Sequence, residues 1–325
     1  MSELWKFCVA PLMDGTDRHC RYFHRLLSKH ARLYSEMITA DAVIHGKRDK
    51  LLGFDRAEHP VALQLGGSDP EKLAMAAKIG ADFGYDEINL NVGCPSGRVQ
   101  SGAFGACLMK TPELVRDCVA GMRAAVRIPV TVKCRIGVDD QIPEESLFTL
   151  VDLVAGAGCE TFIVHARKAL LDGLSPKENR SVPPLEYDLV RRLKRERPDL
   201  TIVLNGGIET INQAQILSQD CDGVMLGRAA YGEPYILATV DEEFFGNAGA
   251  APSREEVALQ MSEYLKQQFE LGVRAHSVTR HMLGLYHGAP GARVWRRYIS
   301  EHAPLARGDI LDGAVDAVRA VRVDA

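Results

Sequence analysis

One cysteine of this sequence stands where an apolar run ends. The segment from Asp86 to Val99 reads DEINLNVGCPSGRV, in which apolar and polar residues alternate until Gly93, Cys94 and Pro95. The alternation predicts a strand, and the proline predicts a turn directly after it. This places the Cys94 thiol at the carboxyl end of a strand. Taken alone, the segment is also compatible with a small buried cysteine, which is the simpler interpretation.

Polar side chains occur at the ends of other apolar runs as well. Gln64 is the last residue but one of PVALQL, Lys133 interrupts PVTVKCRIG, and His165 follows FIV. A buried amide, ammonium or imidazole costs a few kcal/mol, roughly, unless it is paired, so the set as a whole favours a shared ligand. Singly, Gln64 and His165 are better interpreted as hydrogen-bonded core residues. Lys133 is different, because a lysine in a buried strand needs an anionic or electron-rich partner.

Two glycine-bearing turns follow the last two apolar runs. LNGGI contains Asn205, Gly206 and Gly207, and VMLGRAAYG contains Gly227 and Arg228. Each could be a simple turn. Together, with an arginine attached, they predict a phosphate site, because bare backbone amides and helix N-termini hold phosphates at these two positions of many (β/α)8 barrels.

The elements that must position these residues are eight short apolar runs separated by helical patterns. The runs cover residues 6–12, 32–37, 60–65, 86–92, 129–137, 160–166, 200–207 and 221–228. Two of the intervening helices are expected to begin at Asp69 with Pro70 and at Thr111 with Pro112. The repeated order predicts an α/β fold, a parallel (β/α)8 TIM barrel, with a doubly wound open sheet as the alternative. The barrel is favoured because eight strands can close, and such folds keep their chemistry at the carboxyl ends of the strands.

Composition limits the class of protein. The chain has 325 residues, 46% of them apolar and 25% charged, with eight cysteines that show no CxxC pair. We therefore expect a globular protein with free thiols, without a disulfide scaffold or a metal site. No apolar run reaches the roughly 18 to 20 residues of a membrane span, and the first residues do not resemble a signal peptide. The expected location is the cytoplasm.

A second unit is predicted after the barrel. Glycine, alanine, proline and serine gather at residues 244–256, and the next residues, 254–272, have the pattern of an amphipathic helix. We place the barrel at residues 1–246 and a small helical domain at 247–325. The net charge of the chain is −4, but residues 274–307 hold six arginines and one acid, Glu301. A phosphate-binding face is expected there, although the first of these helices could simply extend the core of the barrel.

Several of these motifs, in the same order, resemble the tRNA-dihydrouridine synthases. They are VAPLMDGTDRHCRYFHRLL, PVALQLGGSDP, YDEINLNVGCPSGRVQSGAFGACLM, VTVKCRIG, FIVHARKALLDGLSPKENR, LNGGI and GVMLGRAAY. The segment GLSPKENR is similar to the DusA group, which acts at positions 20 and 20a of the D-loop of tRNA. The resemblance implies a TIM barrel that binds FMN, takes electrons from NADPH or NADH, and reduces uridine to 5,6-dihydrouridine. It implies no membrane and no obligate protein partner.

The resemblance also implies roles for individual residues. Cys94 would be the general acid that protonates C5 of uracil after the N5 atom of reduced FMN delivers hydride to C6. The expected FMN ligands are Pro11, Leu12, Met13, Gln64, Lys133, His165, Asn205, Gly206, Gly207, Gly227 and Arg228. Lys133 would lie beside N1 and O2 of the flavin, where reduced flavin carries negative charge. The expected tRNA contacts are Asn91, Lys177, Arg180, Arg293 and Arg296, with residues 247–325 as the tRNA-binding domain.

Two other functions are compatible with parts of this pattern. An FMN barrel that acts on a free pyrimidine, as dihydroorotate dehydrogenases do, would share the cofactor site and would not need a basic helical domain. A catalytically silent RNA-binding barrel would have lost the flavin site. The colour of the purified protein separates the last alternative from the other two.

Overall fold

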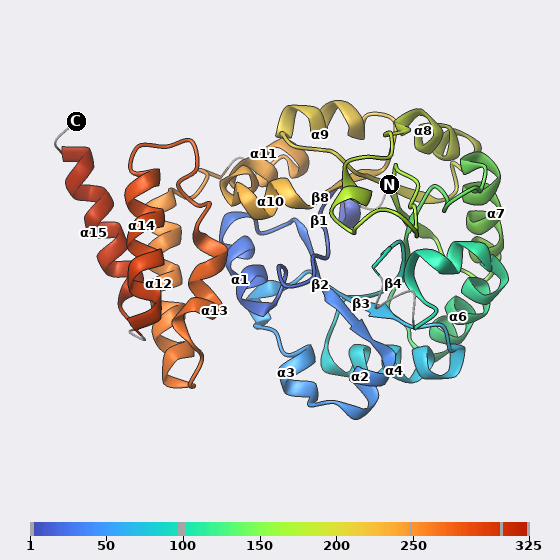
Figure 1. The fold of residues 1–325 in the computed structure, drawn as a ribbon, viewed down its shortest axis with the longest axis horizontal. Helices are drawn as coiled ribbons and strands as arrows, with labels where there is room; N and C mark the ends of the chain where they lie inside the picture. The colour runs from blue at the N-terminus through green and yellow to red at the C-terminus, as the bar shows by residue number, and fades with distance from the viewer. Residues whose placement is uncertain (1–2, 97–101, 248, 306–307, 324–325) are drawn as a thin grey trace.

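The computed structural model describes residues 3–96, 102–247, 249–305 and 308–323 and contains a closed parallel barrel (Figure 1). Its eight strands pair in chain order, and β1 also pairs with β8, with Cys8 opposite Met225. The predicted barrel is confirmed, and the open-sheet alternative is wrong because the two edge strands join. The strands are β1 (Phe7–Val9), β2 (Arg32–Thr39), β3 (Val61–Gly66), β4 (Glu87–Val92), β5 (Val130–Arg135), β6 (Thr161–His165), β7 (Thr201–Asn205) and β8 (Gly223–Leu226).

Helices surround the barrel and face the strands with their apolar sides. They are α1 (Arg18–Leu27), α2 (Ala40–His45), α3 (Arg48–Leu52), α4 (Pro70–Phe83), α6 (Pro112–Ala125), α7 (Pro143–Gly156), α8 (Tyr187–Glu196), α9 (Ile211–Ser218), α10 (Arg228–Gly232) and α11 (Val240–Phe245). Asp69 caps α4 as expected, accepting from the backbone N–H groups of Glu71 and Lys72. Thr111 precedes α6, but its hydroxyl does not cap the helix and instead donates to the carbonyl of Leu108 at 3.5 Å.

The interior of the barrel has two different walls. One is apolar and includes Cys8, Ile163, Val203 and Met225 from β1, β6, β7 and β8. The other consists of polar side chains from β3, β4 and β5, among them Gln64 and Asn89, which are almost completely buried. Buried polar groups need hydrogen-bond partners, so this wall must satisfy its own donors and acceptors.

Four α-helices follow the barrel and form a group beside it (Figure 1). They are α12 (Arg254–Glu270), α13 (Ala275–Thr279), α14 (Ala292–His302) and α15 (Ile310–Val323). Ser253 and Glu256 form a capping box at the start of α12. Leu265, Trp295 and Leu311 are buried, and they belong to the same apolar cluster as the residues between the barrel and its helices, so the core continues from one part into the other. The boundary at residues 246 and 247 stays an interpretation, and no helix among the described residues is long and apolar enough to cross a membrane.

Candidate active site

Cys94 is held at the rim of the barrel by the side chain of Asn91. The Asn91 Oδ1 atom accepts hydrogen bonds from the backbone N–H groups of Gly93 (3.1 Å) and Cys94 (2.9 Å), directly after β4. The Cys94 thiol lies 3.6 Å from the hydroxyl of Ser96. Only Cys94 and Cys107 among the eight cysteines, all within the described chain, are not fully buried. The Cys107 thiol donates to the carbonyl of Phe104 at 2.9 Å, whereas the Cys94 thiol stands directly after β4 and makes the longer contact to Ser96.

Lys133 is the cation of the site. Its Nζ atom donates to Asn205 Oδ1 at 2.9 Å, and the Asn205 amide in turn donates to the carbonyl of Met225 at 2.7 Å. Burial, followed by the positive charge of Arg135, lowers the pKa of Lys133 to about 8. No carboxylate of the described residues pairs with it. A charged lysine that lacks a counter-ion favours a ligand that carries or gains negative charge.

His165 ends β6 as a neutral imidazole. Burial and the nearby charges of Arg135 and Lys133 hold the pKa of His165 well below its usual range. Its Nε2 atom is buried and has no hydrogen-bond partner among the described residues. A Cβ atom on Gly206 would lie 2.6 Å from His165 Cδ2, and Gly206 has φ of 116°. Only glycine therefore allows the backbone after β7 to pass this close to the ring.

Three arginines gather near the ends of β6 and β8. Arg228 donates to the carbonyl of Arg180 at 3.2 Å. Burial, and then the charge of Arg228, lowers the pKa of Arg180, and the same two causes contribute for Arg167. The Nε atoms of Arg167 and Arg180 are buried without hydrogen-bond partners, and no described carboxylate forms a salt bridge with any of the three. Like charges without counter-ions favour the binding of an anion here, which the glycine turns also predict.

Arg135 connects this cluster to the cysteine loop, and sequence reasoning gave it no role. Its guanidinium donates to the carbonyls of Gly93 (2.9 Å), Lys168 (2.8 Å) and Asn179 (3.0 Å). It thereby joins the loop after β4 to the loop after β6. Arg167 was missed too, although its place two residues beyond His165 in the run FIVHAR is a signal that could have found it.

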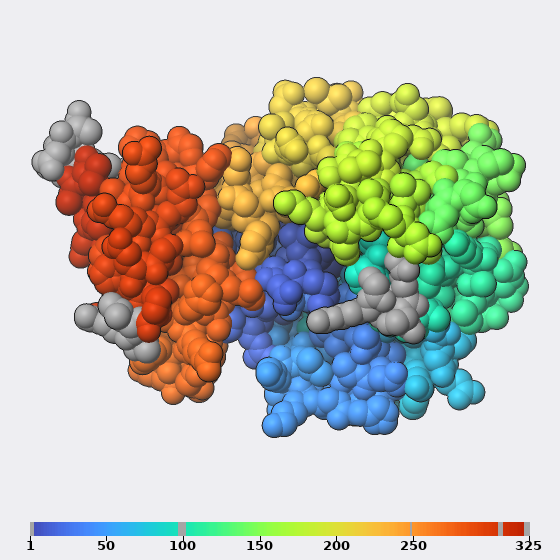
Figure 2. Space-filling model, viewed as in Figure 1, coloured from blue at the N-terminus to red at the C-terminus, as the bar shows by residue number. Residues whose placement is uncertain are grey.

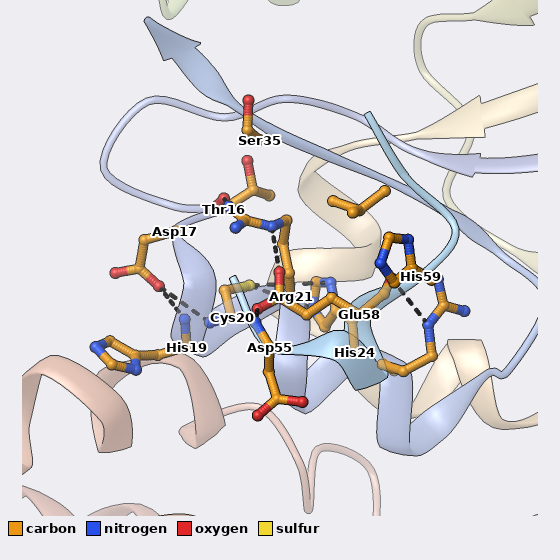
Figure 3. Close-up of polar contacts among 12 residues, drawn as sticks. Thr16, Asp17, His19, Cys20, Arg21, His24, Ser35, Asp55, Glu58 and His59 are labelled. Atoms are coloured by element: carbon orange, nitrogen blue, oxygen red, sulfur yellow. Dashed lines mark hydrogen bonds and ion pairs between the residues drawn. The ribbon is translucent and has the colours of Figure 1, made fainter. Parts of the chain in front are cut away.

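The loop after β1 contains Pro11, Leu12 and Met13 and is held by hydrogen bonds. The backbone N–H of Leu12 donates to the Thr16 hydroxyl at 2.9 Å, and the Thr16 carbonyl accepts from Arg21 at 2.9 Å. Arg21 forms a buried ion pair with Glu58, with 2.7 Å between Nε and Oε2 (Figure 3). The Met13 side chain is 59% exposed, so it is free to cover a ligand at the barrel mouth.

The helices after the barrel are bonded to the same loop. Arg280 donates to the carbonyl of Asp14 (2.9 Å) and to Asp17 Oδ2 (2.7 Å), and His281 Nε2 lies 3.0 Å from Asp17 Oδ1. Asp17 also caps α1 through the N–H of Cys20 (Figure 3). Burial raises the pKa of the Asp17 carboxyl, but the contact with His281 and the hydrogen bonds from Cys20 and Arg280 outweigh it and hold the pKa well below its usual range.

A cleft of about 720 Å³ lies between the barrel and these helices, where Figure 2 shows a hollow beside the orange segment. Its lining residues include the cations Arg18, Lys50, Arg274 and Arg280 and the acids Asp17 and Glu36. The predicted basic tail supplies two of these cations. Arg18 and Lys50 come from the barrel and were not predicted, because isolated basic residues on a helix usually face solvent.

The other predicted RNA contacts are spread over the surface. Lys177 is exposed beside the short helix Glu178–Arg180, and Arg293 and Arg296 are exposed on α14. None of the three lines the cleft, and none forms a salt bridge with a described residue. Arg307, also counted in the basic tail, lies outside the described residues. The roles of Lys177, Arg293 and Arg296 therefore stay predictions.

Comparison with known proteins finds relatives that match most of the chain. The sequence profile of the family described as Dihydrouridine synthase (Dus) matches residues 8–319. A tRNA-dihydrouridine(20/20a) synthase of Vibrio vulnificus is 55% identical over 304 residues, 93% of each chain. A protein of the same name from Shewanella oneidensis is 56% identical over 297 residues, 91% of this chain and 88% of the relative.

Solved structures share the fold at low identity. The old yellow enzyme homologue of Zymomonas mobilis aligns with a TM-score of 0.52 and 14% identity, covering 76% of this chain and 90% of its own. Morphinone reductase aligns with a TM-score of 0.53 and the same identity, covering 76% and 87%. These two likenesses support the barrel alone. The profile match over nearly the whole chain and the identity to curated relatives show that the protein belongs to the dihydrouridine synthase family.

Proposed function

We propose that the protein is a tRNA-dihydrouridine(20/20a) synthase that uses FMN, reduced by NADPH or NADH, to convert uridines of the tRNA D-loop to 5,6-dihydrouridine. The relatives that match most of the chain carry this name. The observation that carries the proposal is the meeting, at one end of the barrel, of a partly exposed thiol, a lysine without a counter-ion and an anion-binding arginine group. The expected location is the cytoplasm, where tRNA is available.

The residues at the barrel mouth fit FMN. The unpartnered nitrogens of Arg167, Arg180 and His165 and the exposed guanidinium of Arg228 suit the phosphate and ribityl groups. Lys133 would favour negative charge on the ring, and the other predicted ligands stand at the same strand ends. When bound, FMN supplies a hydride for the carbon–carbon double bond of uracil.

The protein supplies the proton for the second carbon. Addition of hydride at C6 places negative charge over C5 and the C4 carbonyl, so a donor must wait near C5. Cys94 can fill this role because Asn91 and Arg135 fix the two backbone groups around it, the N–H of Cys94 and the carbonyl of Gly93. Asn91 itself was predicted to contact the uridine, and one of its amide N–H groups goes to Gln64.

A folded RNA fits the surface beside this mouth. The basic cleft between barrel and helices lies next to the loop that carries Met13, and Arg280 contributes to both. Phosphates are attracted by such arginine and lysine groups, and a base must leave its stack to enter an enclosed site.

The test compares Cys94→Ala with Cys107→Ala, since Cys107 is the other thiol that is not fully buried. Cys94→Ala should bind FMN, remain yellow and still be reduced by NADPH, while dihydrouridine formation falls by roughly 100-fold or more because the acid is lost. Cys107→Ala should retain activity. Undiminished tRNA reduction by Cys94→Ala would refute the assignment of the acid. A protein that cannot be reconstituted with FMN, or that reduces free pyrimidines in preference to tRNA, would refute the function.

A further inference from the structure

Five polar side chains form a continuous column inside the barrel, along its polar wall. Gln64 on β3, Glu87, Asn89 and Asn91 on β4, and Thr131 on β5 are at most 8% exposed. Glu87 opens β4 at the start of the strand, and Asn91 ends near Cys94. Glu87, Asn89 and Thr131 are not among the predicted ligands. Their placement therefore needs an explanation other than direct contact with a ligand.

The lower end of the column has a fixed direction, because the Glu87 carboxylate can only accept. Oε2 accepts from Trp5 Nε1 and from Arg32 Nη1, both at 2.9 Å. Oε1 accepts from Tyr34 at 2.8 Å and from Thr131 at 2.5 Å. Burial and the charge of Glu87 hold the pKa of Tyr34 well above its usual range, so its phenol stays a donor. The single hydrogen of the Thr131 hydroxyl is thus committed to Glu87, and its oxygen remains as an acceptor.

Three side-chain amides continue the same donor-to-acceptor direction from Thr131 towards Cys94. Asn89 Nδ2 donates to Thr131 Oγ1 at 2.7 Å, and Gln64 Nε2 donates to Asn89 Oδ1 at 2.8 Å. Asn91 Nδ2 then donates to Gln64 Oε1 at 2.8 Å. In each of the three amides the nitrogen lies on the side of Glu87 and the oxygen on the side of Cys94.

The upper end imposes the same direction independently. The backbone N–H groups of Gly93 and Cys94 can only donate, and both point to Asn91 Oδ1. An amide has similar size in both orientations, so its hydrogen-bond partners decide which one it takes. Turning any of the three would place a buried N–H against another N–H, and aligned hydrogen bonds also polarise one another.

We propose that Glu87, Asn89 and Thr131 are positioning residues of this enzyme. They fix the orientation of the Gln64 amide, an expected FMN ligand, and of the Asn91 amide that holds the Cys94 backbone. The part that concerns flavin rests on the function proposed above. Gln64 uses one N–H for Asn89 and one acceptor site for Asn91. The Glu87 carboxylate, at the far end of the barrel, thereby determines on which side of Gln64 the second N–H and the second acceptor site lie.

The experiment removes one hydroxyl from the middle of the column. Thr131→Val keeps the shape of the side chain but leaves Asn89 Nδ2 without an acceptor, so the orientation of Asn89 and Gln64 is then held from the upper end alone. Thr131→Ser restores the hydroxyl. The dissociation constant of FMN is measured by fluorescence titration of the flavin-free protein, and the kcat and KM for tRNA are measured on the reconstituted enzyme.

For Thr131→Val we expect the FMN dissociation constant to rise roughly 5- to 20-fold, the effect of one unmatched buried hydrogen bond. The kcat should fall while the KM for tRNA stays unchanged, because Thr131 is not a predicted RNA contact and the cleft proposed for the RNA contains none of the five residues of the column. Thr131→Ser should bind FMN within about twofold of the wild type, since it keeps the hydroxyl that donates to Glu87 and accepts from Asn89.

Two controls separate orientation from general stability. Thr161→Val makes the same substitution at a buried threonine of β6, 3% exposed, outside the column. Tyr34→Phe removes another donor to Glu87 but leaves the path from Thr131 to Cys94 intact. Both should lower the thermal midpoint and leave FMN binding unchanged.

The proposal is overturned if Thr131→Val binds FMN as the wild type does, or if Tyr34→Phe or Thr161→Val weakens binding equally. If Thr131→Val does not fold, Thr131→Ala against Thr131→Ser makes the same hydroxyl comparison. Failure of the wild-type protein to bind FMN would instead refute the proposed function, so the two failures are distinguishable.

Discussion

Arg228 should contribute to cofactor affinity and hardly at all to the stability of the flavin-free protein. Its side chain is exposed, and among the described residues its one hydrogen bond is the 3.2 Å contact to the Arg180 carbonyl. Removing it also relieves repulsion of Arg167 and Arg180. Exposed substitutions of this kind change the free energy of unfolding by about 0.5 kcal/mol or less.

The cost in cofactor binding is much larger. A hydrogen bond between a guanidinium and a phosphate contributes about 1.5 to 3 kcal/mol, which corresponds to roughly a 10- to 150-fold change in the dissociation constant. Arg228→Gln should therefore raise the FMN dissociation constant by this factor, while the urea midpoint of the flavin-free protein should not change. Added salt should reduce the difference between variant and wild type, because one charged contact has been removed.

The assay is a fluorescence titration of flavin-free protein with FMN, paired with urea unfolding. Arg192→Gln is the control, because Arg192 on α8 pairs with Glu144 and Glu196 and should not touch the flavin. Equal FMN affinity of Arg228→Gln and wild type would refute the phosphate site. A large loss of stability in the flavin-free variant would show that Arg228 has a structural role instead.

Three further predictions concern pH, the helices and the RNA. Burial lowers the pKa of His24 from 6.5 to about 3. The neutral His24 therefore contributes its full share of the free energy of unfolding above pH 6.5, and this share is lost as the pH falls below 6.5, because only the unfolded chain takes up the proton there. His24→Gln should remove about 2 kcal/mol of the loss between pH 7 and pH 5, measured by urea unfolding at both values, and an unchanged pH slope would contradict this. Arg280→Ala should lower the free energy of unfolding by about 1 to 2 kcal/mol, since His281 still partners Asp17, and should raise the KM for tRNA; normal values of both would show that the contact is dispensable. Replacing Arg293 and Arg296 together by Ala should raise the tRNA KM and lower its salt slope by up to about two units without changing flavin reduction by NADPH, and an unchanged slope would move the RNA elsewhere.

The strands could be predicted because alternation and apolar runs are local properties of the sequence. VTVKCRIG and FIVHA gave both the strands and the strand-end residues Lys133 and His165. Closure of the barrel followed from the count of eight. Thr111 shows the limit of local signals: it stands where a helix cap is expected, yet its hydroxyl finds the carbonyl of Leu108 instead.

The features that sequence reasoning missed depend on long-range contacts. Glu87 opens a strand and would usually be interpreted as a surface residue, but it is fully buried, with Trp5 as a partner 82 positions away. Arg280 reaches Asp17 across 263 positions. Neither spacing nor composition carries information about such pairs, because they are decided by how the barrel closes and where the helices pack.

The central claim is that this protein reduces uridines of the tRNA D-loop, with Cys94 as the acid. The most direct measurement maps dihydrouridine in tRNA from cells that have the gene, lack it, or carry it with Cys94→Ala. We predict dihydrouridine at positions 20 and 20a with the intact gene, and its absence from the deletion strain and from the Cys94→Ala strain. Unchanged dihydrouridine at both positions in the deletion strain would contradict the account.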